Sequence, residues 1–237
     1  MNVYPVNLME GAAIASQQRE SHSLLTDIHN RYLDFTVDFT AREITVQADW
    51  RSIVEADSFI IGNTNAVRGT LRLALNGTAV YTRTFDTPME INIVEFDSKR
   101  SFNAATFTFS GNENIFIGLL YIGEKWTLPR FITFPKHPLS LRSEHGRTFS
   151  AQVTGIPSTN VRGFSASFVR IPDIEVKKID RYINGVQTVI PHVIDAYPLA
   201  HREVPPMFAT IAAYGEKEKR AENGFFWNFE ITWMEAR

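Results

Sequence analysis

The stretch GTLRLALNGTAVYTRTF, Gly69 to Phe85, alternates between apolar and polar side chains and carries a turn signal at its centre. Before that turn, Leu71, Leu73 and Leu75 recur at every second position. Side chains of a β-strand point alternately to opposite faces, so this period predicts a strand with one buried face. The dipeptide Asn76-Gly77 accepts the positive φ angles of a tight turn, which predicts that the chain returns as a second, antiparallel strand.

Other segments of the first half show the same period over similar lengths. They are separated by Asp, Ser, Asn and Gly residues, which are typical of turns. Regularly spaced short strands with turn signals predict an antiparallel β-sandwich. These segments are Leu33–Phe39, Glu43–Trp50, Ser58–Ile61, Glu90–Phe96, Ala105–Gly111 and Asn114–Gly123.

Three prolines, Pro129, Pro135 and Pro138, interrupt this pattern and mark a predicted boundary between two domains. Proline removes a backbone donor from a β-ladder and blocks helix formation, so the segment is predicted to connect two folded parts. Residues 1–130 are then an N-terminal arm followed by the β-sandwich, and residues 131–237 form a smaller domain.

The smaller domain is predicted to be a β-rich α+β domain with one helix. Pro172 and Asp173 match a helix start and Gly185 lies just past its end. Between them, Val176 and Ile179 begin an apolar stripe at helical spacing. Alternating patterns before and after the helix predict strands, so the fold class of the whole chain is mainly β.

The composition excludes several classes of partner and cofactor. The net charge is −2 and the pI is about 6.3, without a long basic run, so a nucleic-acid partner is not expected. The chain has no cysteine, which excludes disulfides, iron–sulfur clusters and thiolate zinc sites. We predict no metal and no cofactor. No window approaches 18 apolar residues and no signal-peptide pattern is present, so we expect synthesis in the cytoplasm without membrane insertion.

Candidate catalytic residues are few. The six histidines show no metal-binding spacing, and the segment GFSAS from Gly163 to Ser167 lacks the second glycine of a nucleophile elbow. One polar trio, Asp195, His201 and Glu203, contains the carboxylate–histidine combination that a hydrolase uses. Three nearby prolines favour a stiff, solvated loop instead. We therefore expect that the chain is not an enzyme, with a hydrolase at this trio as a weaker alternative.

The segment from Gly62 to Ala66, GNTNA, follows an apolar strand and ends in loop-forming residues. With Arg68, its side chains Asn63, Thr64 and Asn65 offer hydrogen-bonding groups that suit sugar hydroxyls. The alternative is purely structural, because Asn tolerates left-handed φ angles and bonds backbone groups within turns. The sequence leaves both readings open and favours the structural one.

The last strand of the chain is unusually apolar. Its second face keeps Phe226 and Met234 beside polar residues, where a half-buried strand normally shows a polar face. Aromatic residues and methionine are enriched in interface cores, so these two side chains are predicted subunit contacts. The alternative is a central strand that its own domain covers on both faces.

The order of segments resembles a known family. The small-residue segment Ala13–Ser16 and the strand pair that follows precede the strand into Asn63-Thr64-Asn65. A late strand, FIGLLYIG, then leads out through Pro129. This series resembles the N-terminal galactose-binding-like, or discoidin-like, jelly roll of structural proteins from bacteriophage tails.

The resemblance implies a function through protein–protein contacts. It implies a non-enzymatic virion component of a tail tip, baseplate or neck, with other tail proteins as partners and a homo-oligomeric ring as its assembly. No catalytic residue is implied. The alternative function is a carbohydrate-binding module that uses the loop end of the N-terminal sandwich.

Overall fold

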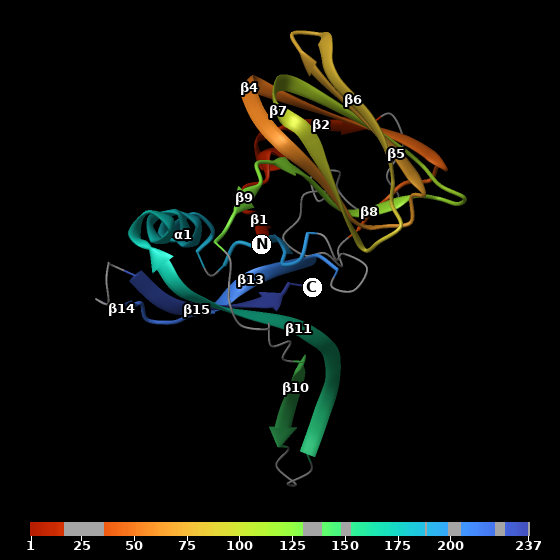
Figure 1. The fold of residues 1–237 in the computed structure, drawn as a ribbon. Coiled ribbons are helices and arrows are strands. Elements are labelled where there is room, and N and C mark those ends of the chain that lie inside the picture. Colours follow the sequence, from red (N-terminus) through yellow and green to blue (C-terminus); the bar gives the residue numbers. More distant parts are fainter. Residues whose placement is uncertain are drawn as a thin grey trace. The chain divides into compact units, whose positions relative to one another are not determined.

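The computed structural model describes residues 1–16, 36–129, 139–147, 153–187, 189–198, 205–220 and 226–236, without the side chains of 139–147, 153–162 and 219–220. The chain divides into two compact units (Figure 1). The first comprises Met1–Thr127 with His192–Met207, and the second comprises Leu128–Pro191 with Phe208–Arg237. Within the described residues the chain is mainly β with a single α-helix, which confirms the predicted fold class.

The first unit contains a seven-stranded antiparallel sheet in the order β3-β8-β4-β7-β5-β6, with β2 paired to β4. Two of its strands, β4 and β7, are much longer than the others. The strands are β2 (Ala13–Ser16), β3 (Val37–Asp38), β4 (Glu43–Thr64), β5 (Arg68–Leu75), β6 (Thr78–Asp86), β7 (Ile91–Ser110) and β8 (Phe116–Gly123).

Strands β4 and β7 each belong to both layers of the sandwich. The beginning of β4 pairs with the end of β7, whose other edge pairs with β5; the end of β4 pairs with the beginning of β7 and with β8. Register shifts in β4 after Asp49 and after Ala56 separate these two parts. Bulges bend a strand and increase its twist, so segments that the sequence predicted as four separate strands are two continuous bent ones.

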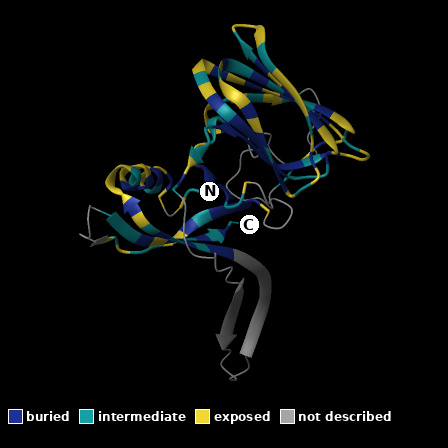
Figure 2. Cartoon of the chain, viewed as in Figure 1, coloured by how far each residue is buried: buried dark blue, intermediate teal, exposed yellow. Residues whose placement is uncertain are grey.

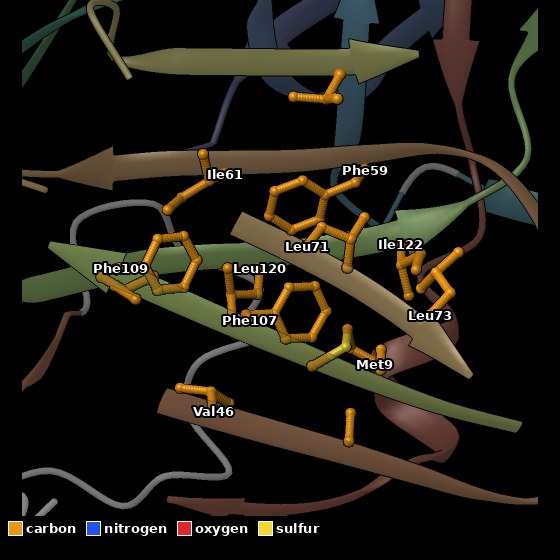
Figure 3. Close-up of a cluster of buried hydrophobic side chains, with 14 of the residues drawn as sticks. Met9, Val46, Phe59, Ile61, Leu71, Leu73, Phe107, Phe109, Leu120 and Ile122 are labelled. Carbon is orange, nitrogen blue, oxygen red and sulfur yellow. The ribbon is translucent and has the colours of Figure 1, made fainter. Parts of the chain in front are cut away.

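The core lies between the two layers (Figure 3). Val46 and Ile61 from the two parts of β4 join Phe107 of β7 and Leu71 of β5 in one buried cluster. The rings of Phe59 and Phe107 lie 5.1 Å apart, a spacing typical of favourable aromatic pairs. The alternating apolar residues of the sequence therefore supply the inner faces of both layers.

The hairpin predicted from Gly69 to Phe85 is confirmed as β5 and β6. Leu73 lies opposite Tyr81 and Leu75 lies opposite Thr78. Asn76 has φ 50° and Gly77 has φ 84°, the positive values that a tight two-residue turn requires. Figure 2 shows that β6 is mostly exposed, as expected for a strand at the edge of the sheet.

A smaller ribbon completes the first unit. Strand β1 (Asn2–Tyr4) pairs antiparallel with β12 (His192–Asp195) on one edge and with β9 (Trp126–Thr127) on the other. A short 3-10 helix, Leu8–Gly11, follows β1, and the Leu8 carbonyl accepts a 2.8 Å hydrogen bond from the indole N–H of Trp50.

In the second unit one helix packs on a β-sheet. The sheet order is β10-β11-β15-β13, with β14 also paired to β15. The Trp233 indole N–H donates to the Tyr182 hydroxyl at 2.9 Å, which fixes α1 to β15. The predicted helix and its start at Asp173 are confirmed, but its predicted end is wrong: Gly185 lies inside α1, and Gln187 with φ 52° caps it. The elements are β10 (Leu139–Arg147), β11 (Val153–Pro172), α1 (Asp173–Val186), β13 (Met207–Tyr214), β14 (Glu218–Arg220) and β15 (Phe226–Glu235).

The two predicted subunit-contact residues lie on β15. This strand is central, between β11 and β13, and buries Phe229, Ile231 and Trp233. Phe226 and Met234 are only half-buried within the chain. Their role as subunit contacts stays a prediction.

Candidate functional site

Four connections meet at one end of the sandwich, and backbone hydrogen bonds close this end. The Val67 N–H donates to the Ser110 carbonyl at 2.8 Å, and the Gly111 N–H donates to the Arg42 carbonyl at 2.9 Å. Ile115 is fully buried there. The centre of the loop end is therefore filled by the chain itself.

Two of the predicted ligand-binding residues use their polar groups to bond the backbone of residues 114–116, at the start of β8. The Asn65 amide donates to the Asn114 carbonyl at 2.8 Å and accepts from the Phe116 N–H at 2.9 Å. The Thr64 hydroxyl donates to the Phe116 carbonyl at 2.7 Å and accepts from the Ala66 N–H at 3.1 Å. These side chains hold the 63–66 tip against the start of β8.

The other two predicted residues lie beside the connection from β6 to β7. Asn63 has φ 44°, and its N–H donates to the Glu90 carbonyl at 2.7 Å. Arg68 forms a 3.2 Å ion pair with Asp86, and both side chains are mostly exposed. The predicted residues are thus brought together at one tip, and Arg68 connects that tip with the end of β6.

A hollow of about 410 Å³ lies next to this tip, between β6 and the beginning of β7. In the described residues β6 pairs only with β5, and the beginning of β7 pairs only with β4, so two free strand edges border the hollow. Its lining is Arg83, Thr84, Phe85, Asp86, Pro88, Met89, Asn92, Ile93, Val94 and Glu95. The volume falls in the range of roughly 300–1,000 Å³ that is typical of small-molecule sites.

The register directs backbone groups of both edges toward the hollow. The Thr87 N–H bonds the Val67 carbonyl of the neighbouring segment. Since backbone groups of an antiparallel strand point to alternate sides, the N–H and C=O of Thr84 point away from β5. The hydrogen bond from the Asn63 N–H to the Glu90 carbonyl shows the same alternation on β7. By that alternation, the N–H and C=O of Ile93 point away from β4. The hollow therefore offers main-chain donors and acceptors as well as side chains.

The apolar part of the lining is held by the core. The Phe85 ring lies 5.3 Å from that of Phe59 and 6.3 Å from that of Phe109. Asn92, which is 3% exposed, accepts from the Met89 N–H at 3.0 Å and donates to the Met89 carbonyl. The Phe85 ring and the Asn92 amide are therefore both held by contacts within the chain.

The charged part of the lining is more exposed. The Arg83 guanidinium donates to the Glu95 carbonyl at 3.4 Å and lies 4.0 Å from the Asp97 carboxylate. The Glu95 carboxylate accepts from Lys125 at 2.8 Å and from the Tyr4 hydroxyl at 3.3 Å. Burial and the neighbouring Glu95 charge raise the pKa of Tyr4, so its hydroxyl stays protonated and serves as a donor.

The remaining sequence candidates do not assemble a second site in the part of the chain that the structure describes. Asp195 is 1% exposed on β12, while His201 and Glu203 lie outside the described residues. Among the residues with described side chains there is no cluster of metal-ligating groups and no helix long and apolar enough to cross a membrane.

The hollow was not predicted from the sequence. Its charged residues form no motif: Arg83 and Asp86 lie on β6, and Glu95 lies on β7. Of the residue types typical of turns, the lining contains Pro88, Asp86 and Asn92, which stand in no recognisable pattern. What creates the hollow is the pairing of β6 and β7 with other strands and not with each other, which is a property of the topology.

Comparison of the sequence with protein-family models and with curated proteins finds no match. Solved structures give partial similarities. The lectin domain of Lectinolysin complexed with Lewis B antigen has TM-score 0.45 and 9% identity, covering 51% of this chain and 98% of that one. The family 32 CBM from C. perfringens NanJ in complex with galactose has TM-score 0.43 and 14% identity, covering 53% and 100%.

SpGH29 has TM-score 0.45 and 8% identity over 50% of this chain, which spans only 28% of that structure. All three TM-scores lie below 0.5, so these similarities transfer neither a family nor a ligand to this chain. The predicted role in a bacteriophage tail gains no support from the comparisons and stays a prediction.

Proposed function

We propose that this chain is a non-enzymatic carbohydrate-binding module whose ligand occupies the hollow between β6 and β7. The observation that carries the proposal is the combination of an apolar wall at Phe85 and Met89 with exposed polar groups at Arg83 and Asp86. The 63–66 tip supports this wall from the side and is not itself the contact surface.

The chemistry of a sugar matches this combination. A pyranose ring has an apolar C–H face and a fringe of hydroxyl groups, so its sites join apolar surface with a few oriented donors and acceptors. In the hollow, Met89 and Pro88 offer apolar surface, and the carboxylate of Asp86 offers acceptors. The free edges add main-chain groups that hydroxyls can bond.

If exposed side chains bind the ligand, their removal should lower the affinity for glycan without lowering the stability of the fold. Arg83 and Asp86 lie on the surface, and their ion pairs with Asp97 and Arg68 are exposed and contribute about 0–1 kcal/mol to stability. Arg83 adds one long, exposed hydrogen bond to the Glu95 carbonyl. The double variant Arg83→Ala with Asp86→Ala should therefore fold normally and lose glycan binding.

A glycan array followed by isothermal titration calorimetry on its best ligand tests this proposal. The matched control is Asp49→Ala with Arg51→Ala, an equally exposed pair on β4 outside the hollow. We expect the control to bind like the wild type. A wild-type chain that binds no glycan, or a hollow variant that binds as well as the control, would overturn the proposal.

A structural role in a bacteriophage tail is the second candidate function, and one observation favours it. Phe226 and Met234 are half-buried on β15, which leaves apolar surface that a neighbouring subunit would cover. Light scattering at micromolar concentration should then show an oligomer that Phe226→Ser with Met234→Ser disrupts. A strict monomer would count against this role and against a virion location.

A further inference from the structure

The charged side chains that line the hollow differ in how closely they are paired with opposite charges. The Asp86 carboxylate lies 3.2 Å from Arg68, and the Glu95 carboxylate lies 2.8 Å from Lys125. Neither of these cations belongs to the lining. Each lining carboxylate is therefore already neutralised from outside the hollow.

Arg83 is the only arginine or lysine of the lining, and its contacts are long. Its distance to Asp97 is 4.0 Å and its hydrogen bond to the Glu95 carbonyl is 3.4 Å, both near the limit for such interactions. Both contacts use one terminal nitrogen, so the other N–H groups of the fork have no partner among the described residues. The side chain is 46% exposed and forms part of the lining of the hollow.

We infer that Arg83 makes the hollow selective for saccharides that carry a carboxylate, such as uronic acids. The inference rests on the proposed function and names its ligand class. A guanidinium binds a carboxylate through two parallel hydrogen bonds, and such charge-assisted pairs are stronger than bonds to neutral hydroxyls. Phe85 and Met89 then contact the ring while Arg83 holds its acidic substituent.

In this arrangement Asp97 competes with the ligand carboxylate for the Arg83 guanidinium. It is 82% exposed, and its carboxylate lies 4.0 Å from the Arg83 guanidinium. A ligand carboxylate at a shorter distance would replace it, because a 4.0 Å exposed ion pair contributes little. Removal of the Asp97 charge should therefore strengthen the binding of an acidic saccharide and leave a neutral one unaffected.

Matched pairs of saccharides that differ only at C6 test this inference. The probes are oligomers of galacturonate and galactose, and of glucuronate and glucose, measured by calorimetry at low and high salt beside a sulfated oligosaccharide. We expect the wild type to bind the acidic member of a pair roughly tenfold more tightly, with the preference falling as salt screens the charge. Arg83→Gln should abolish the preference, and Asp97→Asn should increase it.

The outcomes separate the inference from the proposed function. Binding of neutral and acidic members with equal affinity would overturn the inference and leave carbohydrate binding in place. Equal or tighter binding of the sulfated probe, lost in Arg83→Gln, would show general anion recognition and also overturn it. Absence of any saccharide binding would overturn the proposed function itself. Arg83→Lys keeps the charge without the fork, and an unchanged preference in that variant would contradict the two-bond geometry.

Discussion

Two neighbouring regions at one end of the sandwich use polar residues in opposite ways. At the 63–66 tip, the Asn65 amide and the Thr64 hydroxyl bond the backbone of residues 114–116. In the hollow, the two contacts that Arg83 makes with described residues are long, and its other N–H donors have no partner among those residues. A cluster of polar residues in a turn therefore does not identify a binding site unless its hydrogen-bonding capacity is still available.

The same contrast holds for the apolar residues. Ala66 and Ile115 are almost fully buried at the centre of the loop end. Phe85 and Met89 are only partly buried, because the free edges of β6 and β7 leave one side of them open. The difference arises from strand pairing, since a closed ladder between β6 and β7 would cover these residues.

The largest expected effect comes from Gly69→Ala on β5, directly beneath the hollow. A Cβ at Gly69 would overlap the Phe85 ring and approach Cδ1 of Phe109 to 3.0 Å. Because the Phe85 ring is held between two others, the strain should lower the free energy of unfolding by about 3 kcal/mol. Displacement of Phe85 should also weaken glycan binding. Chemical denaturation and calorimetry measure both effects, and an unchanged stability would contradict the tight contact.

Asn65→Ala should destabilise the tip without affecting the hollow. The variant loses two hydrogen bonds to backbone groups, at a cost of about 2 kcal/mol. Asn114→Ala is the matched control, because the exposed Asn114 contributes its carbonyl to this contact and should stay within about 0.5 kcal/mol of the wild type. If a folded Asn65→Ala variant lost glycan binding, the ligand site would lie at the tip and not in the hollow.

Gly77→Ala changes the far end of the same hairpin. Gly77 has φ 84° and no atom within 4 Å of its added Cβ, so the cost is conformational and about 1 kcal/mol. Gly185→Ala, in α1 with free space around it, should instead be neutral or stabilising. Thermal unfolding compares the two, and a stabilising Gly77→Ala would contradict the turn geometry.

The smallest effect on stability is expected for Arg83→Gln, within about 0.5 kcal/mol of the wild type. Its side chain is half-exposed and its ion pair is long. Denaturation curves of the two proteins should overlap. A loss of 2 kcal/mol or more, on the order of a core mutation, would mean that Arg83 acts as a structural clasp between β6 and β7 and is not available to a ligand.

The sequence predicted those features that depend on local patterns. The period of Leu71 and Leu73 and the turn at Asn76-Gly77 were enough for the β5–β6 hairpin, and Asp173 correctly marked the start of α1. Its end was placed too early, because Gly185 lies within the helix and Gln187 caps it. The continuity of β4 and β7 was not visible, because a bulge and a turn show the same interruption of period in a sequence.

The candidate site depends on pairing between distant segments and could be predicted only in part. Asn63, Thr64, Asn65 and Arg68 lie close together at the end of β4 and the start of β5, and their role in ligand binding stays a prediction. The partners of Asn65 lie about 50 residues further along the chain. No local signal states that these amide groups are already bonded. The hollow likewise exists because β6 and β7 do not pair with each other, and residue types alone do not show which strands stay unpaired.

Backbone NMR during a saccharide titration tests most directly whether ligand binds at the hollow and not at the tip. The ligand is the best binder from the array, and the readout is the set of amide shifts that move. The account predicts shifts at residues 83–95, largest near Arg83 and Met89, with residues 63–66 and 114–116 little changed. Shifts confined to the tip, or spread along β15 around Phe226 and Met234, would contradict it.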